Sequence, residues 1–190
     1  MKLDILESNE GAFRFSIKGA GPGLANAIRR SALNSVKTFA IDKVTFYENT
    51  TAMFDEYIAQ RIGLVPIKTP SKGYNDTDEI VFTLDATGPK TVYSKELESQ
   101  DKDVRVANEN IPIMKLAEGQ RLRIDGKAIM GIASRHSKFQ PGLVTYSEEN
   151  GSHIFYVEPF GQMPPKEIIN KALEAIKEEL KDVEKEAKKL

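Results

Sequence analysis

The C-terminal segment PPKEIINKALEAIKEELKDVEKEAKKL (164–190) carries the clearest periodic pattern of the chain. Its proline pair is typical of the first turn of a helix. Apolar side chains then recur at alternating steps of four and three residues: Ile169, Leu173, Ile176, Leu180, Val183, Ala187 and Leu190. This heptad seam, with charged residues between, predicts a long amphipathic helix. The helix packs either on its own domain or against a helix of another chain, and the length of the seam favours the second.

A β-hairpin and a helix are expected at the other end of the chain. KLDILES (2–8) and AFRFSIKG (12–19) alternate in polarity around the turn NEG, as paired strands do. GAGPG (19–23) breaks the second strand, and Pro22 suits the first turn of a following helix. That helix is expected from Leu24 to about Lys37, with an apolar stripe of Ala25, Ile28, Ala32 and Val36.

Between these helical segments the chain is mainly strand-like. AIDKVTFYE (40–48) predicts a strand, and NTTAMFDEYIAQRIG (49–63) predicts a short helix ending at Gly63. From residue 79 to 146 short apolar stretches alternate with glycine, proline and polar breakers, which indicates a series of short strands. A further strand is expected in SHIFYVEPFG (152–161).

Composition excludes several classes of function. The chain has 190 residues, with 27 basic residues against 28 acidic ones, so an extended nucleic-acid surface is not expected. It has no cysteine and two histidines, which rules out disulfides, thiolate metal sites and a zinc site built by histidine alone. No apolar run is long enough to cross a membrane and no signal-peptide pattern begins the chain, so we expect a cytoplasmic protein.

Two stretches invite an enzymatic interpretation. The turn with Gly21 and Gly23 before a helix could bind a phosphate, but it lacks the third glycine of a dinucleotide motif, and Pro22 removes a backbone donor. The stretch SRHSKFQPG (134–142) places His136 beside Lys138, yet no glycine elbow surrounds its serines. A structural role for His136 and Lys138 in an ordered loop is favoured over a catalytic one, and the carboxylates lack metal-loop spacing.

Four stretches together resemble a known family. LANAIRRSALNSV (24–36) resembles the first-helix motif of the α family of RNA polymerase assembly subunits. FDEYIAQRIGLVPIKTP (54–70) is similar to the D-E-x-I-A-x-R-x-G-L-x-P run of the archaeal and eukaryotic members. HSKFQPG (136–142) resembles their later H-A-K-W/F-x-P motif, and YVEPFGQMPPKEIINKALE (156–174) their return strand and last helix. The resemblance points to the archaeal, D-type branch of the family and spans nearly the whole chain.

The resemblance implies an α+β fold of two domains, one inserted into the other. Residues 1–45 and 151–190 would form a discontinuous dimerisation domain, and residues 46–150 an inserted β-rich domain. In the family this dimerisation domain pairs through helices with a smaller homologous subunit, which is the L-type subunit in archaea. The pair is the platform on which the two large catalytic subunits and the small platform subunits assemble. The subunit would contact nucleic acid only indirectly, through that complex.

Site residues follow from the same resemblance. The expected dimer interface comprises Leu24, Ala25, Ile28, Ala32, Val36, Ile169, Leu173, Ile176, Leu180 and Val183. The expected large-subunit contacts are Arg29, Arg30, Gln60 and Arg61, although Arg29 and Arg30 could instead pair with acidic residues of their own chain. Many D-type members carry a cysteine-rich iron–sulfur insertion, and eukaryotic counterparts bind zinc through cysteines. Without cysteine we expect the short form, with no cluster, no zinc and no other cofactor.

Two other hypotheses stay open. One is a free-standing enzyme that binds a phosphorylated ligand through the Gly21–Gly23 turn and the His136–Lys138 loop. The other is a homodimeric coiled-coil adaptor, which accounts for the heptad seam but not for DEYIAQRIGLVPI (55–67). For the assembly subunit we expect no catalytic site of its own, although it would belong to a nucleotidyltransferase complex.

Overall fold

The computed structural model describes residues 1–189 and confirms the α+β class, with helices beside antiparallel sheets. Leu190, the last position of the heptad seam, lies outside the described residues. Contacts divide the chain into two compact units. Unit 1 comprises Met1–Lys37 and Ile132–Leu190, and unit 2 comprises Thr38–Gly131. Each is described separately below.

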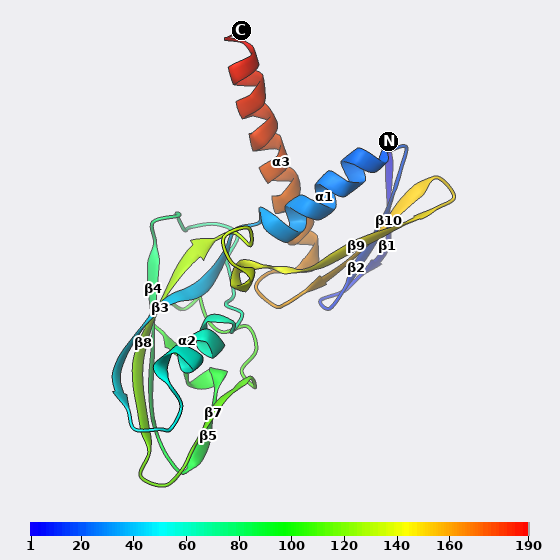
Figure 1. Ribbon diagram of the computed structural model, residues 1–190. Coiled ribbons are helices and arrows are strands. Elements are labelled where there is room, and N and C mark those ends of the chain that lie inside the picture. The colour runs from blue at the N-terminus through cyan, green and yellow to red at the C-terminus, as the bar shows by residue number, and fades with distance from the viewer. Residues whose placement is uncertain (190) are drawn as a thin grey trace. The chain divides into compact units, whose positions relative to one another are not determined.

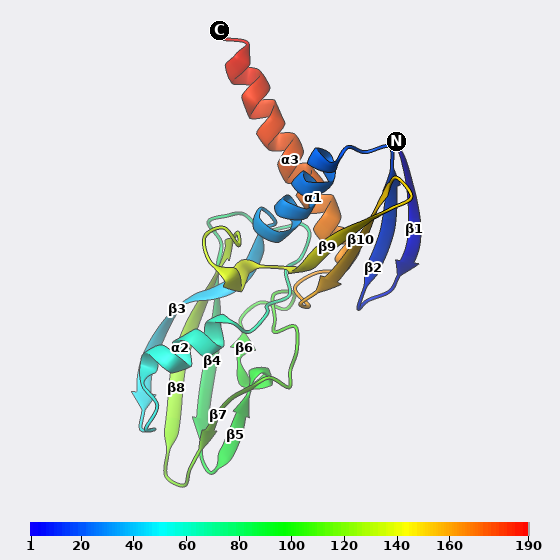
Figure 2. The same ribbon diagram turned by 45° about the vertical axis from the view of Figure 1, so that its right-hand side comes forward.

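Unit 1 is a four-stranded antiparallel sheet with two helices on one face (Figure 1). The strand order is β1-β2-β10-β9, and the helices contact each other as well as the sheet (Figure 2). The bounds are β1 Lys2–Ser8, β2 Phe13–Lys18, β9 Gly142–Glu149, β10 Ser152–Pro159, α1 Pro22–Asn34 and α3 Pro165–Ala187, with a short 3-10 turn at Ser137–Phe139. The expected hairpin, both expected helices and the proline in the first turn of each helix are confirmed. The first helix ends at Asn34 rather than near Lys37, so Val36 lies beyond it.

The core of unit 1 is built by the alternating strand pattern. Phe13, Phe15 and Ile17 are buried on the face of β2 that the helices cover, whereas the residues between them are not. The ring of Phe15 stacks on that of Phe155 in β10, with centroids 4.9 Å apart. Offset aromatic stacking of this kind adds to the free energy gained from burial alone.

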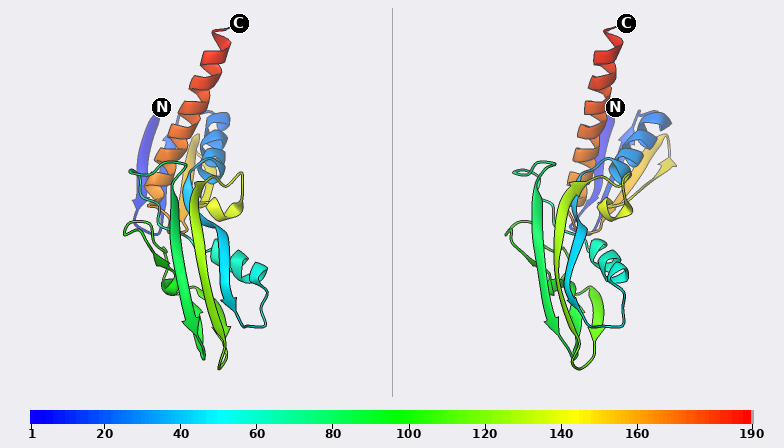
Figure 3. Two further views of the ribbon diagram at one scale, coloured as in Figure 1. Left: turned by 90° about the vertical axis from the view of Figure 1, so that its left-hand side faces the viewer. Right: turned by 60° about the vertical axis from the view of Figure 1, so that its left-hand side comes forward.

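Unit 2 packs one helix and a two-stranded sheet against a larger sheet (Figure 3). The larger sheet has the order β3-β8-β4-β6, and β5 pairs with β7. The bounds are β3 Thr38–Asn49, α2 Asp55–Gly63, β4 Glu79–Thr87, β5 Lys90–Tyr93, β6 Glu98–Ser99, β7 Pro112–Leu116 and β8 Arg121–Gly131, with a 3-10 turn at Ser94–Glu96. The helix buries Ile58 and Ile62, four residues apart, as expected.

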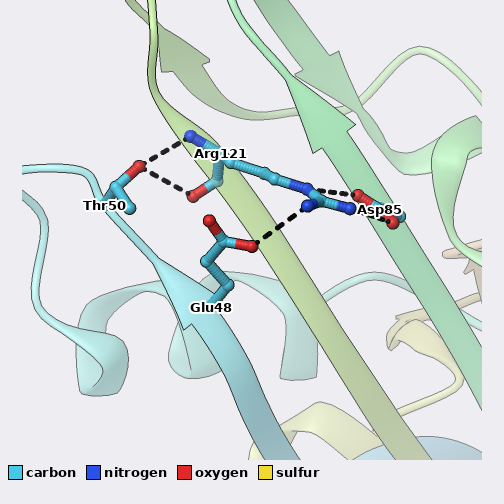
Figure 4. Close-up of polar contacts among 4 residues, drawn as sticks. All are labelled: Glu48, Thr50, Asp85 and Arg121. Atoms are coloured by element: carbon cyan, nitrogen blue, oxygen red, sulfur yellow. Dashed lines mark hydrogen bonds and ion pairs between the residues drawn. The ribbon is translucent and has the colours of Figure 1, made fainter.

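A charged cluster joins three strands of unit 2 at one end of the sheet (Figure 4). The Arg121 guanidinium lies 2.8 Å from an Asp85 carboxylate oxygen on β4 and 3.3 Å from Glu48 on β3. The backbone of Arg121 also exchanges hydrogen bonds with the Thr50 hydroxyl. The hydrogen bond from Arg121 lowers the pKa of the Asp85 carboxyl below its usual 3.8. Arg121 therefore fixes the register where β3 ends and β8 begins.

The boundaries of the units differ from the expected 45/46 and 150/151. They fall at 37/38 and 131/132 because β3 pairs with β8 along almost its whole length, starting at Thr38 opposite Gly131. The sequence pattern places residues 142–149 in the inserted domain, but as β9 they pair with β10 in unit 1. Strand pairing over a long separation, rather than local composition, decides these boundaries.

Candidate protein interface

Five of the ten expected interface residues are covered by their own chain. Ala25, Ile28, Ala32, Val36 and Ile169 are all buried in the core of unit 1. Small residues let α1 and α3 approach so closely that the Ser31 hydroxyl donates to the Ala172 carbonyl at 2.9 Å. The expectation that this stripe meets a partner is corrected, because the chain's own sheet and α3 already cover it.

The other five expected interface residues remain accessible. Leu24 and Leu173 are partly exposed, Ile176 is half-buried, and Leu180 and Val183 are 63% and 66% exposed. The change occurs along α3, whose buried residues are all at or before Ala172. The heptad seam therefore serves the chain's own core in its first turns and faces outward in the rest.

A groove runs between α1 and the exposed part of α3. Its volume is about 570 Å³, and its lining includes Ala27 and Arg30 from α1 and Ile176, Leu180 and Val183 from α3. The rest of the lining is polar, with Ser31, Asn34, Ser35, Ser134 and Glu179, so the aliphatic side chains of α3 share the groove with hydroxyl and amide groups, one cation and one anion. Such a groove suits an amphipathic helix of another protein, whose apolar side chains would enter it.

Within the described residues, the paired arginines of α1 are not held by acidic side chains. Arg29 donates to the Asn26 side-chain oxygen at 2.9 Å, and Arg30 is exposed. Among residues 1–189 neither guanidinium forms an ion pair. The alternative of intrachain pairing with Asp or Glu is therefore wrong, and Arg30 presents free donors beside the groove.

Arg61 has a different environment from the one expected. Its Nε donates to the Ile113 carbonyl at 2.5 Å, and a terminal nitrogen donates to the Pro112 carbonyl at 2.7 Å. It therefore holds α2 onto β7 within unit 2, although both Arg61 and its neighbour Gln60 are exposed. The outward contact of Arg61 stays a prediction, and its guanidinium already binds two backbone carbonyls.

Two groups of exposed apolar residues were not expected. On unit 2, Met53, Phe54 and Tyr57 are exposed beside an open pocket of about 460 Å³. The sequence signal was available for Tyr57, which lies off the Ile58–Ile62 stripe that packs inward. Phe54 has the spacing of that stripe, four residues before Ile58, but it is the extended N-cap residue of α2 and stays exposed. On unit 1, Leu3 and Ile5 of β1 are exposed although they alternate like core residues.

The loop that contains His136 and Lys138 has a structural explanation. The His136 Nδ1 accepts a hydrogen bond from the Lys138 amide, which caps the 3-10 turn at Ser137–Phe139. Both Arg135 and Lys138 lie over the Phe139 ring, within 6 Å of its centroid. Gly21 is the N-cap of α1, followed directly by Pro22. These contacts order the loop and begin the helix.

One further pair of titratable groups with shifted pKa values lies in unit 2. In unit 2, burial and a hydrogen bond to Asp101 raise the pKa of Tyr74 to about 12. Hydrogen bonds from the Asp103 and Val104 amides lower the pKa of Asp101, so this pair anchors one loop on another. Within the part of the chain that the structure describes, no cluster of acidic or histidine residues is suited to a metal, and no helix is long and apolar enough to cross a membrane.

Comparison with known proteins agrees with this arrangement. The model of the RNA polymerase Rpb3/RpoA insert domain matches residues 36–144, which include all of unit 2. The chain is 45% identical to DNA-directed RNA polymerase subunit Rpo3 of Methanocaldococcus jannaschii over 87% of this chain and 84% of that protein. It is 44% and 42% identical to the Rpo3 subunits of Pyrococcus furiosus and Thermococcus kodakarensis, over 81% of this chain in each case.

The matched region spans only 61% and 62% of the Pyrococcus and Thermococcus proteins. The Methanocaldococcus match, by contrast, extends over most of both chains, so both units contribute to the likeness. The matched insert domain and these relatives agree with the two-unit fold and the exposed seam of α3. The chain therefore belongs to the family of archaeal α-like RNA polymerase subunits.

Proposed function

We propose that this chain is a non-catalytic assembly subunit of a cytoplasmic DNA-directed RNA polymerase, equivalent to the short form of the archaeal D-type member. It forms an obligate heterodimer with an L-type subunit, and the heterodimer is the platform for the two large catalytic subunits. The relatives are named as polymerase subunits, which supports the proposal. The Arg30 side chain and the Met53–Tyr57 surface are the parts that we assign to contacts with the larger subunits.

The observation that carries the heterodimer is the exposed part of the α3 seam. Leu173, Leu180 and Val183 are open to water beside a groove formed with α1. Burying an aliphatic side chain completely is worth roughly 1.5–3 kcal/mol. Covering three such side chains and Ile176 therefore gives a partner helix several kcal/mol, whereas leaving them exposed favours aggregation.

Co-expression with a candidate L-type subunit tests the proposal. Light scattering should give a one-to-one complex, and Leu180→Glu should abolish it because a carboxylate would enter the apolar seam. The matched control is Leu143→Glu, since Leu143 is an exposed leucine of β9 that pairs with Glu158 on the uncovered face of the same sheet. A complex that survives Leu180→Glu, or a chain indifferent to the L-type subunit, would contradict the heterodimer.

The contact with the large subunits is tested on the preformed heterodimer. Arg30→Glu should weaken capture of a large subunit while the heterodimer stays intact, because the free guanidinium is a donor for carboxylates and carbonyls. Arg14→Glu is the control, as Arg14 is exposed on the uncovered face of β2. Equal loss of capture in both variants would show a general charge effect and refute the assignment of Arg30.

The short form is tested by metal analysis of the purified heterodimer. We expect iron and zinc well below one atom for each copy of this chain, since it has no cysteine ligands. One equivalent of either metal bound to this chain would refute that part of the proposal.

A further inference from the structure

The turn that joins β9 to β10 contains the one asparagine of the chain that is followed by glycine (Figure 1). Glu149 pairs with Ser152 in the antiparallel ladder, so Asn150 and Gly151 alone close the hairpin. Both lie at positive φ, +51° for Asn150 and +70° for Gly151, and among residues 1–189 Asn150 is the single non-glycine residue with a positive φ. Two successive residues at positive φ are characteristic of the type I′ turn.

The side chain of Asn150 is accessible and is not held by hydrogen bonds. It is exposed, and within the described part of the chain its amide has no hydrogen-bond partner. Asn9, in the other hairpin turn of unit 1, is also exposed but is held. Its side-chain oxygen accepts from two backbone amides and its nitrogen donates to Glu7.

We propose that Asn150 is the site at which this chain deamidates, and that the folded turn slows the reaction. The Gly151 backbone nitrogen attacks Cγ of Asn150, so a new N–Cγ bond forms and the bond from Cγ to Nδ2 breaks. Nδ2 leaves as ammonia and takes up the proton that the Gly151 nitrogen loses. Water then opens the cyclic imide at either carbonyl carbon, which gives aspartate or isoaspartate. Glycine favours the attack because no side chain shields its nitrogen.

The backbone of the turn keeps the reacting atoms apart. The imide ring contains Cβ and Cγ of Asn150 and the Gly151 nitrogen, so ring closure needs Cβ and that nitrogen on the same side of the Asn150 Cα–C bond. Asn150 lies in the left-handed region, where ψ is about +47°. At this ψ the Gly151 nitrogen lies almost opposite Cβ across the Cα–C bond. The turn must therefore open before the imide forms, and the rate of deamidation reports how often this end of the hairpin opens.

The turn is also connected to the start of α1. His153 is buried, and its Nε2 lies 3.1 Å from the Ala20 carbonyl oxygen. Because a carbonyl can only accept, Nε2 carries the hydrogen and donates it. The ring of His153 lies edge-on to that of Tyr146, with centroids 5.5 Å apart. Ala20 directly precedes Gly21, the N-cap of α1, so the end of the hairpin holds the chain where this helix begins.

Isoaspartate would disturb this connection, whereas aspartate would not. Isoaspartate adds a carbon to the main chain inside a turn whose length sets the register of its strands. The pairs next to the turn, Glu149 with Ser152 and Glu148 with His153, would lose their alignment. Aspartate leaves the main chain unchanged and tolerates the left-handed region as asparagine does.

Incubation of the full chain in mildly alkaline buffer tests the site and its protection together. Folded chain and chain in denaturant are compared, and mass spectrometry of their peptides follows the conversion of amide to acid at every asparagine. We expect Asn150 to react first in both samples, and at least about tenfold more slowly in the folded chain, because opening a paired hairpin end costs free energy. Asn150→Gly keeps a residue suited to positive φ but has no amide, so it is the unreactive control.

Two further measurements test the connection to α1. His153→Ala removes the ring beside the turn and should raise the rate several-fold in the folded chain but not in denaturant. Leu143→Ala is the matched control, because Leu143 is exposed at the other end of β9. In the isolated isoaspartate form the Leu24 and Ala25 amides, which donate to the Gly21 carbonyl, should exchange hydrogen faster. Freshly purified Asn150→Asp, which adds the same charge without lengthening the main chain, should not show this change.

Three results would overturn the proposal: another asparagine that reacts before Asn150, equal rates at Asn150 in the folded and unfolded chains, or no reaction of Asn150 in denaturant. An unchanged folded rate in His153→Ala, or unchanged exchange in the isoaspartate form, would refute the connection between the turn and α1. None of these results depends on binding of an L-type subunit, so they leave the test of the heterodimer separate.

Discussion

Replacing Arg61 by methionine should destabilise unit 2 rather than remove a contact with another subunit. The guanidinium donates to the carbonyls of Ile113 and Pro112, and both hydrogen bonds join α2 to β7. A hydrogen bond from a charged donor contributes about 1.5–3 kcal/mol when it is shielded from water. Because Arg61 is exposed, water can replace part of each bond. We therefore expect a loss of about 1–2 kcal/mol for the pair.

Hydrogen exchange measures this effect locally, which matters because a chain of two units need not unfold in one step. A loss of about 1–2 kcal/mol corresponds to roughly 5–30-fold faster exchange of the amides of α2 and β7. Arg61→Lys should lose most of the same protection, since an ammonium group cannot make the forked contact. Gln60→Ala is the control, because Gln60 is the exposed neighbour on the same helix.

The reasoning is refuted if Arg61→Met leaves exchange in α2 and β7 unchanged but abolishes capture of a large subunit by the heterodimer. That result would place the guanidinium in an intersubunit contact and make the two carbonyl contacts incidental.

Three further predictions concern stability. Phe15→Ala should cost about 3–5 kcal/mol in unit 1, measured by denaturant unfolding, because the ring is 1% exposed and stacked; a loss under about 1 kcal/mol would contradict this packing. The pKa of the Asp85 carboxyl is lower in the folded chain than in the unfolded chain, where it is about 4. The ion pair with Arg121 therefore contributes fully to the free energy of unfolding above about pH 4, and this stabilisation is lost as the pH falls through the folded pKa. In Arg121→Gln this pH-dependent part of the stability should be missing when the chain is unfolded by acid. An acid unfolding curve identical to that of the unaltered chain would refute the role of the Asp85–Arg121 ion pair. The raised pKa of Tyr74, about 12, means that its hydrogen bond to Asp101 stabilises the fold below the unfolded pKa of 10 and is lost as pH rises through the folded value. When tyrosine ionisation is followed by absorbance, the step at the highest pH should therefore be missing in Tyr74→Phe.

Local patterns in the sequence were sufficient for the elements of unit 1. Alternation located the hairpin, and apolar spacing located α1 and α3, because both signals act within a few neighbouring residues. These patterns could not determine whether an apolar stripe is covered by the chain's own sheet and helices or is left exposed. The stripe of α1 and the distal seam of α3 look alike in sequence, yet Ile28 is buried by the chain and Leu180 is not. That distinction depends on where the sheet ends in space.

Long-range geometry explains the remaining differences. Arg61 looked like an outward residue because its partners in β7 are distant in the chain and are backbone atoms, which leave no mark in composition. The assignment of residues 142–149 to the insert failed for a similar reason, because their pairing with β10 cannot be read from their own polarity. Tyr57 shows the converse, since its place off the buried Ile58–Ile62 stripe of α2 was visible in the sequence. The exposure of Phe54 was not visible, because Phe54 has the spacing of that stripe and only its extended N-cap conformation keeps it outside.

The pairing of Thr38 with Gly131 has a consequence for how this architecture changes over time. The first and last residues of unit 2 face each other as partners in one antiparallel ladder, where facing Cα atoms are about 4.5–5.5 Å apart. A tight turn could close that gap, so the whole module can be excised, exchanged or enlarged by grafting without moving the strands and helices to which it is attached. Evolution can thus edit one module of such a chain while the other keeps its shape.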